Sequence, residues 1–323
     1  MKVLGVALAV LASIVLVGAL VTVVATLVIE RRHSPNGRFV EVKGGRLHLV
    51  DLAPADRSPL GTVLLLHGAS GSSGDPLLAL GGRLAERYRV IAVDRPGHGW
   101  SDRIDGAAMA SPARQAEVIW EALTAIGVER AIVVGHSWSG ALATNMTLDH
   151  ADRVAGLVLL SPVSHPWPGG NIAWYYNPTV APGIGTFLAR VVATPLGLLA
   201  LHPAARAVFH PQEARPDYVE AARASLVLRP RTFRANAEDV AGLHAFVTAQ
   251  SRRYGAIRAP TVILSGEADR IVWTNLHSRA LEREIPGARL VVLPGIGHMP
   301  HFAAADRIVA EINGLATAVA AAR

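Results

Sequence analysis

Residues 131–146 read AIVVGHSWSGALATNM, an apolar run that passes through a short turn into a helix-forming segment. The run Ala131–Gly135 has the continuous apolar character of a strand buried on both faces, and the chain from Trp138 onward can form a helix. A strand, a sharp turn and a helix are the setting in which a serine hydroxyl is held beyond the edge of a sheet. The stretch therefore predicts Ser137 as a candidate nucleophile.

The turn departs at one position from the pattern G-x-S-x-G. The residues two before and two after the serine must be small so that the strand and the helix can approach closely. Gly135 meets this condition, whereas Ser139 stands where the second glycine would be. We expect the Ser139 hydroxyl to point to solvent or to bond within the first helical turn. Ser139 is the weaker candidate nucleophile, because it would already lie inside the helix with Ser137 and Ala141 on either side.

Further apolar runs alternate with helical stretches along the chain. Residues around Lys43-Gly44-Gly45 alternate in polarity, which predicts a hairpin of Arg38–Val42 and Arg46–Val50. The lengths of Ser111–Ile126 and Ala303–Ala318 suit helices. Continuous apolar runs predict more strands at Thr62–Leu66, Val90–Val93, Val154–Leu160, Thr261–Leu264 and Leu290–Leu293. This order of elements predicts an α/β fold with a mostly parallel central sheet flanked by helices.

One connection is too long for a simple crossover, which needs about a dozen residues. We interpret residues 163–255 as a helical lid inserted between two pieces of one core, residues 37–162 and 256–323. The segment holds most of the aromatic residues of the chain, and more than half of these are expected to form the lid's own small core. The lid candidates for substrate contact are Trp167, Trp174 and Tyr175. The lid also has more arginines than acidic residues, which suits a solvated face or a surface against anionic lipid headgroups.

The N-terminus is strongly apolar. Val3–Ile29 contains no charged residue and no proline, and at about 1.5 Å per residue it can cross a hydrocarbon core of roughly 30 Å. We assign residues 1–33 as an uncleaved, single-pass membrane anchor. A secretory signal peptide is the alternative, although the run is longer than the usual apolar region of about 7–15 residues. Arg31, Arg32 and the basic residues after them outnumber Lys2, so the positive-inside rule places the catalytic domain in the cytoplasm.

Composition narrows the classes of function. The chain has no cysteine, which removes disulfides, thiolate catalysis and cysteine-ligated metals. Its formal net charge is +6, but the arginines are scattered and lack the aromatic-interleaved clusters of nucleic-acid binders. We therefore expect no nucleic-acid partner.

A serine nucleophile needs a base and a group that orients the base. The chain offers Asp269 in a Gly-x-x-Asp loop after one predicted strand, and His298 in a Gly-His loop after the next. His67-Gly68 follows an earlier strand. With this Ser…Asp…His order, the chain from about Gly37 onward resembles the α/β-hydrolase fold family, and its loop Asp94–Ser101 is similar to the one that follows the next strand in that family.

The resemblance implies a role for each matching residue. Ser137 would be the nucleophile, His298 the general base and then the general acid, and Asp269 the carboxylate that fixes the imidazole tautomer. The implied oxyanion hole consists of the backbone N–H groups of Trp138, directly after the nucleophile, and Ala69. The site would thus be complete without a metal or a cofactor.

Neighbouring residues offer alternatives for these roles. Glu267 could replace Asp269, but it lies two residues early for the motif. His301 could replace His298, but only His298 directly follows the turn glycine. We interpret the other loop histidines as makers of structural hydrogen bonds rather than metal ligands, because no acid or histidine shares a ligand spacing with them: His67, His98 and His136.

A Ser-His-Asp site with an oxyanion hole suits acyl transfer to water, so we expect hydrolysis of a small-molecule carboxylic ester. Relatives that open epoxides or displace halide place an aspartate where Ser137 stands, which excludes those two reactions. Carbon–carbon bond hydrolysis of dienoic ring-fission products and cofactor-free perhydrolysis use the same residue types and stay open. The apolar lid and the anchor favour a lipid-like ester. A different class also stays open, a catalytically inactive, membrane-anchored interaction module.

Overall fold

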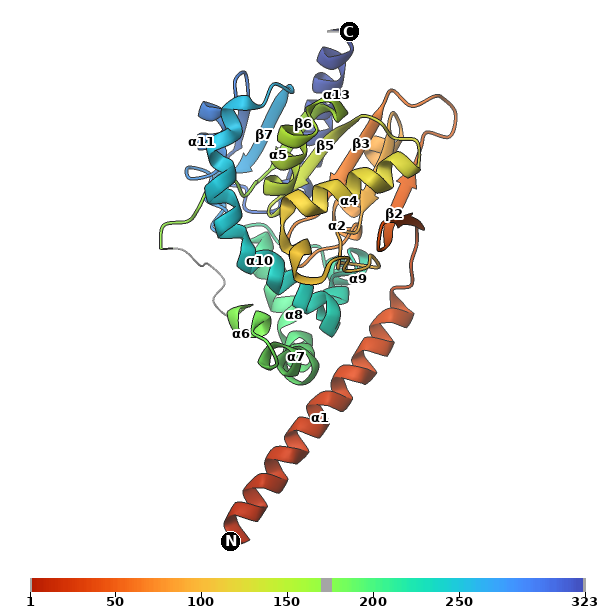
Figure 1. The fold of residues 1–323 in the computed structure, drawn as a ribbon. Coiled ribbons are helices and arrows are strands. Elements are labelled where there is room, and N and C mark those ends of the chain that lie inside the picture. Colours follow the sequence, from red (N-terminus) through yellow and green to blue (C-terminus); the bar gives the residue numbers. More distant parts are fainter. Residues whose placement is uncertain (1, 170–175, 322–323) are drawn as a thin grey trace.

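The computed structural model describes residues 2–169 and 176–321. The described residues form one eight-stranded sheet with helices on both faces (Figure 1). Its strands are β1 (Arg38–Val42), β2 (Gly45–Leu52), β3 (Thr62–Leu66), β4 (Arg89–Val93), β5 (Ala131–His136), β6 (Val154–Leu160), β7 (Thr261–Gly266) and β8 (Arg289–Leu293). The predicted strands are confirmed, several of them one or two residues longer than expected.

The strands lie in the order β1-β2-β4-β3-β5-β6-β7-β8. Strand β2 runs antiparallel to both β1 and β4, and the remaining neighbours are parallel. The carboxyl ends of β3 to β8 therefore meet at one edge of the sheet. Loops that follow different strands can bring their side chains together there.

The middle strands are buried along their whole length, because helices cover both faces of the sheet. Every residue of β5 and of β6 is buried, and successive side chains point to opposite faces. Val133 and Leu157 pack with α4 (Pro112–Ala125) and α5 (Ser139–Asp149) in one apolar cluster. On the other face, Ile132 and Val158 pack with α13 (Ala305–Ala321). This two-sided burial explains why the predicted strands read as continuous apolar runs.

The chain between β6 and β7 is helical in its described part. Its helices gather at one end of the sheet (Figure 1): α6 (Asn177–Val180), α7 (Ile184–Leu188), η5 (Ala189–Ala193), α8 (Thr194–Phe209), α9 (Tyr218–Ala221), η6 (Ala224–Leu228), α10 (Pro230–Gln250) and η7 (Ser251–Ala256). The movement of this segment as a lid remains a prediction. The other short helices are α2 (Gly74–Pro76), η1 (Leu77–Gly81), α3 (Gly82–Ala85), η2 (Gly106–Ala110), η3 (Ala151–Arg153), α11 (Ser278–Glu284) and α12 (Pro300–Ala303).

The N-terminal residues form one long apolar helix, α1 (Lys2–Arg32). Its N-terminal half extends away from the rest of the molecule, and its C-terminal half lies beside η5 and α8 (Figure 1). By length and composition alone α1 is able to cross a membrane, as is the helical stretch Ile184–Phe209. Within α1, the buried side chains are those of Thr22 and Ile29.

Candidate active site

Ser137 occupies a tight turn between β5 and α5. Its φ angle of 53° lies in the left-handed region, which is strained for a residue with a side chain. Two backbone hydrogen bonds hold this conformation, from Ser137 N–H to the carbonyl of Leu160 (3.0 Å) and from Val163 N–H to the carbonyl of Ser137 (2.9 Å). Since both partners belong to β6 or the residues just after it, the neighbouring strand fixes the turn.

Two glycines let the strand and the helix close around this turn. A Cβ atom on Gly135 would lie 2.4 Å from the carbonyl oxygen of Ser139. A Cβ atom on Gly140 would lie 2.5 Å from the Cβ of Pro162. The close approach after the nucleophile therefore falls at residue 140, one position later than the pattern G-x-S-x-G places it, which is why a serine fits at position 139.

The expectation for the Ser139 hydroxyl is wrong. Ser139 is fully buried, and its hydroxyl donates a hydrogen bond of 2.6 Å to the backbone carbonyl of His67. Strands β3 and β5 are neighbours in the sheet, so the carbonyl at the end of β3 faces the start of α5. The extra hydroxymethyl group thus joins the nucleophile turn to the loop that follows β3.

Three side chains form a hydrogen-bonded chain at the carboxyl edge of the sheet. His298 Nδ1 lies 2.8 Å from Asp269 Oδ2, and His298 Nε2 lies 2.9 Å from Ser137 Oγ. A carboxylate only accepts hydrogen bonds, so the Nδ1 atom carries the proton and Nε2 accepts from the serine hydroxyl. The second oxygen of Asp269 accepts the N–H groups of Ile271 (2.8 Å) and Val272 (2.9 Å). The arrangement can remove a proton from Ser137 and hold the imidazolium that results.

The side chains of Glu267 and His301, the alternatives to Asp269 and His298, form no hydrogen bond with the other residues of the triad. Glu267 is exposed to solvent, whereas Asp269 retains 7% of its accessible surface and points to His298. The Nε2 atom of His301 lies 3.0 Å from Asp75. The fold thus brings together the serine, aspartate and histidine expected from the motifs, and neither alternative joins them.

Two backbone N–H groups beside Ser137 remain available for a ligand. Within the described ranges, the N–H groups of Ala69 and Trp138 donate to no protein acceptor. The next amide along the first loop, that of Ser70, donates to the side chain of Asn236 in α10 (2.7 Å). The loop that carries Ala69 is therefore held by the helical segment between β6 and β7.

A buried ion pair that the sequence did not indicate lies behind this loop. Arg95 and Asp239 are fully buried, with 2.7 Å between Nη1 and Oδ2. Arg95 also donates to the carbonyls of His67 (3.2 Å) and Gly68 (3.3 Å). The Trp138 ring lies 4.0 Å from the guanidinium and donates to the carbonyl of Asp239 (3.0 Å). These contacts tie α10 to both loops of the expected oxyanion hole.

The pKa of His67 falls to about 3, because the ring is buried and Arg95 lies nearby. The ring is therefore neutral. Its Nδ1–H donates to the carbonyl of Gly68 (2.8 Å), and its Nε2 accepts the backbone N–H of Arg95 (3.0 Å). His98 lies within 3.4 Å of the carbonyl of Pro96 through its Nδ1.

His136 belongs to a buried cluster with Asp75 and His301, whose nitrogen and oxygen atoms lie within 4.8 Å of one another. This is a donor set of a kind that binds zinc, and its members come from three separate parts of the chain, so residue spacing did not reveal it. The contacts within the fold are hydrogen bonds. The hydroxyl of Tyr218 donates to Asp75 (2.8 Å), and His136 Nε2–H donates to the backbone carbonyl of His298 (2.9 Å). The cluster thus supports the main chain of the triad histidine.

Of the three residues predicted to contact the substrate, the structure describes Trp167. Trp167 is buried in the main apolar cluster, with its ring edge-on to His277 at 4.6 Å between centroids. Trp174 and Tyr175 lie outside the described residues. Contact between these side chains and a substrate remains a prediction.

Comparison with known proteins agrees with this architecture. Residues 61–305 match the family model of the α/β-hydrolase fold. A 2-hydroxy-6-oxo-6-phenylhexa-2,4-dienoate hydrolase of Burkholderia cepacia is 30% identical over 291 residues, covering 86% of this chain and 95% of that protein.

Two crystal structures share the fold. The enol-lactonase of Burkholderia xenovorans LB400 aligns with a TM-score of 0.68 and 19% identity over 87% of this chain and 100% of its own. A membrane phospholipase A described as a bacterial virulence factor aligns with a TM-score of 0.68 and 23% identity over 99% of both chains, so that this alignment includes α1. The family match and the hydrolase relative together indicate an enzyme that acts as a hydrolase. This chain belongs to the α/β-hydrolase fold family.

Proposed function

We propose that the protein is a serine hydrolase that cleaves carboxylic esters through an acyl-enzyme intermediate. One observation carries the proposal, the hydrogen-bonded chain from Ser137 through His298 to Asp269, next to two backbone N–H groups without a described acceptor. The strained φ of Ser137 supports it, since strain of this kind is retained where function requires it.

In the first half of the reaction, Ser137 Oγ attacks the carbonyl carbon of the ester while His298 Nε2 takes the hydroxyl proton. Asp269 stabilises the imidazolium through Nδ1–H. The carbonyl oxygen becomes negative and binds the N–H groups of Ala69 and Trp138; one such donor is worth about 2.7–4 kcal/mol of the barrier. The intermediate then expels the alcohol oxygen, which receives the proton from His298.

In the second half, water attacks the acyl-enzyme and His298 Nε2 takes the proton of that water. The new tetrahedral intermediate uses the same two N–H groups. It breaks at the bond to Ser137 Oγ, which recovers the proton from His298, and the carboxylic acid leaves. The same groups therefore serve both halves, with the histidine alternating between base and acid.

Carbon–carbon bond hydrolysis is the second candidate. It is favoured by the Burkholderia cepacia relative, whose name specifies a dienoate substrate and which this chain matches over most of its length. The inactive interaction module has less support, because each of the three triad side chains is present and hydrogen-bonded.

We infer that α1 anchors the protein in a membrane with the catalytic domain in the cytoplasm. The large apolar side chains of α1 are mostly exposed, and Arg31 and Arg32 end the helix on the side of the catalytic domain. Retention of the intact N-terminus in carbonate-washed membranes supports the anchor. A mature chain that begins after α1 would identify a signal peptide instead. Protease cleavage of the catalytic domain only in inside-out vesicles supports the cytoplasmic location.

Labelling with a fluorophosphonate probe tests the nucleophile. The full-length protein in detergent should be labelled, Ser137→Ala should not, and Ser139→Ala should retain labelling as the matched serine control. Absence of labelling in the parent protein, together with absence of turnover, would favour the interaction module.

The reaction type is decided with two classes of substrate. p-Nitrophenyl butyrate and decanoate are compared with 2-hydroxy-6-oxo-6-phenylhexa-2,4-dienoate on the same preparation. A higher kcat/KM for the esters supports our proposal. A higher value for the dienoate assigns carbon–carbon bond hydrolysis to the same three residues.

A further inference from the structure

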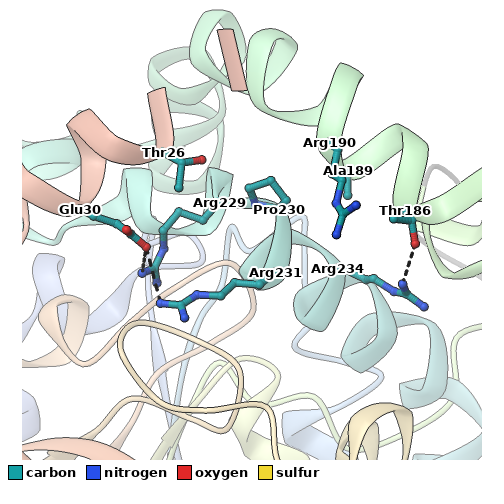
Figure 2. Close-up of a pocket in the computed structure, with 9 residues that line it drawn as sticks. All are labelled: Thr26, Glu30, Thr186, Ala189, Arg190, Arg229, Pro230, Arg231 and Arg234. Carbon is teal, nitrogen blue, oxygen red and sulfur yellow. Dashed lines mark hydrogen bonds and ion pairs between the residues drawn. The ribbon is translucent and has the colours of Figure 1, made fainter. Parts of the chain in front are cut away.

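A cavity separate from the triad lies where α1 meets the helices between β6 and β7 (Figure 2). Its volume is about 440 Å³. The lining comes from α1, from α7 and η5, and from α10 with the residue before it, and its polar residues include Thr26, Glu30, Arg190, Arg229, Arg231 and Arg234. The cavity thus joins the apolar N-terminal helix to the proposed lid.

The lining is strongly cationic, since four arginines face one glutamate and leave an excess of three positive charges. That glutamate, Glu30, is already shared by Arg229 at 3.3 Å and Arg231 at 3.6 Å. Arg234 donates to Thr186 (2.9 Å) on the far side of the cavity and pairs with Glu238 (3.2 Å), which lies outside the lining. Arg190 is therefore the lining arginine with no carboxylate partner among the described residues.

Arg190 is exposed and has no hydrogen-bonding or ionic partner in the described ranges. In Figure 2 its side chain points from η5 into the space between the other arginines. Burial and the neighbouring Arg231 lower the pKa of Arg229 to about 10, in keeping with this concentration of positive charge.

A buried hydroxyl lies in the wall of the same cavity. The hydroxyl of Thr26 is buried and has no partner among the described residues, and the Thr26 side chain lies opposite Arg190 across the cavity (Figure 2). Phosphate oxygens accept hydrogen bonds from hydroxyl and guanidinium groups together, and guanidinium groups bind them in a bidentate manner. The chemistry of the lining therefore suits a phosphate group.

The position of the cavity along α1 identifies the source of that phosphate. Val3–Thr22 spans about 30 Å as a helix, the thickness of a hydrocarbon core. Thr26 and Glu30 then lie at the level of the lipid headgroups. Gly18 packs so closely on Val191 of η5 that a Cβ atom on it would lie 2.5 Å from the Val191 carbonyl. Gly18 is about 6 Å below Thr22 along the helix, a depth typical of interfacial helices.

The helices beside the cavity carry an exposed apolar surface, which insertion about 6 Å into the hydrocarbon core requires. Large apolar side chains of α7 and α8 are exposed: Ile184, Phe187, Leu196, Leu198 and Leu199. These side chains would enter the acyl region next to α1, while the arginines remain in the headgroup layer. Apolar helices and a cationic cavity at one level are complementary to an anionic lipid surface.

We propose that this cavity binds the phosphate of an anionic phospholipid headgroup and that α7 and α8 insert into the same leaflet, so that the proposed lid lies on the membrane. The inference rests on the membrane anchoring proposed above and specifies which lipid the protein contacts. It also places the helices between β6 and β7 next to a supply of lipid-like esters.

The test uses the full-length protein in detergent micelles and follows the melting temperature as short-chain lipid is added. Dioctanoyl phosphatidylglycerol should raise the melting temperature in a saturable manner. Dioctanoylglycerol, which lacks the phosphate, and inorganic phosphate, which lacks the chains, should have much smaller effects. Arg190→Gln should weaken the apparent affinity for phosphatidylglycerol about fivefold, as expected for one surface arginine.

Arg252→Gln provides the matched control, because Arg252 is an exposed arginine of η7 outside the cavity lining. It should bind phosphatidylglycerol as the parent protein does. Equal weakening by both substitutions, or equal stabilisation by dioctanoylglycerol, would overturn the proposal. Saturation by inorganic phosphate with the same effect as the lipid would assign the cavity to free phosphate and overturn the lipid assignment.

Hydrolysis of p-nitrophenyl butyrate by the same parent sample separates this inference from the proposed function. An active protein that does not discriminate phosphatidylglycerol refutes only the headgroup site. A protein that binds the lipid selectively but hydrolyses no ester refutes only the esterase proposal.

Discussion

The turn between β5 and α5 and the contact between α1 and the proposed lid are built in opposite ways. At the turn, Ser137 retains 9% of its accessible surface, and its backbone is hydrogen-bonded on both sides. At the α1 contact, Leu199 and Ile184 remain 79% and 62% exposed, and Arg190 has no described partner. At the turn, groups of the protein itself therefore supply the contacts that hold Ser137.

The contact between α1 and the proposed lid leaves large apolar side chains exposed, and these require an apolar environment rather than water. Large apolar patches are seldom left exposed to water unless they meet a membrane or a partner. Contacts within the protein therefore determine the geometry around Ser137. What the exposed surface beside α1 binds depends on whether a membrane or another partner covers it.

Replacement of the triad carboxylate should have the largest effect. Asp269→Asn should lower kcat for ester hydrolysis about 10⁴-fold, because the amide favours the wrong imidazole tautomer. Glu267→Gln, on the same loop but exposed, should retain the activity of the parent protein. Comparable losses in the two variants, measured with p-nitrophenyl butyrate, would show that the hydrogen bond from Asp269 to His298 does not control the reaction.

Loss of the buried ion pair should be the largest effect on stability. Asp239→Ala leaves Arg95 charged and buried, which should lower the free energy of unfolding by about 3–5 kcal/mol. Glu238→Ala removes a carboxylate that Arg103 and Arg234 share, and it should cost less than Asp239→Ala because Arg103 keeps its ion pair with Asp239. Chemical unfolding of both variants in detergent measures the difference. Equal losses would mean that the Arg95 network does not hold α10 to the sheet.

The two positions after the nucleophile should respond differently to alanine. Gly140→Ala places a Cβ atom against Pro162 and should cost about 1–3 kcal/mol. Ser139→Ala should cost about 1 kcal/mol, because the carbonyl of His67 keeps its hydrogen bond from Arg95. Unfolding free energies of the two variants give the order. A larger loss in Ser139→Ala would show that its hydroxyl, rather than the close approach at residue 140, holds the turn.

Mild acid should destabilise the fold slightly. Burial lowers the pKa of His277 to about 3, so the folded state binds this proton more weakly than the unfolded state does. The stability from this group is complete well above pH 6.5 and falls as the pH drops toward 3. Between pH 7.5 and pH 6 the loss is about 0.8 kcal/mol.

Substitution isolates this contribution. His277→Gln should remove it from the pH dependence of the unfolding free energy, whereas His202→Gln, at an exposed position of α8, should not. An unchanged pH dependence in His277→Gln would place the acid sensitivity at another buried histidine.

Much of the site could be predicted from the sequence, because its signals are local. The nucleophile turn, the Gly-x-x-Asp loop and the Gly-His loop each follow an apolar run, and parallel strands bring such loops to one edge of the sheet. For Ser137, Asp269 and His298, residue type and order were therefore enough to predict that they meet. That α1 is long enough to cross a membrane could also be predicted, because this depends only on the rise per residue of a helix and on the apolar character of the run.

The distant groups that hold these local segments in place could not be predicted from the sequence. Arg95 and Asp239 are 144 residues apart in the chain, and the contact from Ser139 to the His67 carbonyl exists because β3 and β5 are neighbours. The arginine cavity likewise requires that α1 pack on η5 and that Glu30 pair with Arg231 at the start of α10. Periodicity and turn chemistry report on a few adjacent residues, whereas a buried polar pair depends on how whole elements pack. The strands, the long apolar helix and the order of the triad residues thus follow from local sequence, whereas the partners that hold them in place follow from packing.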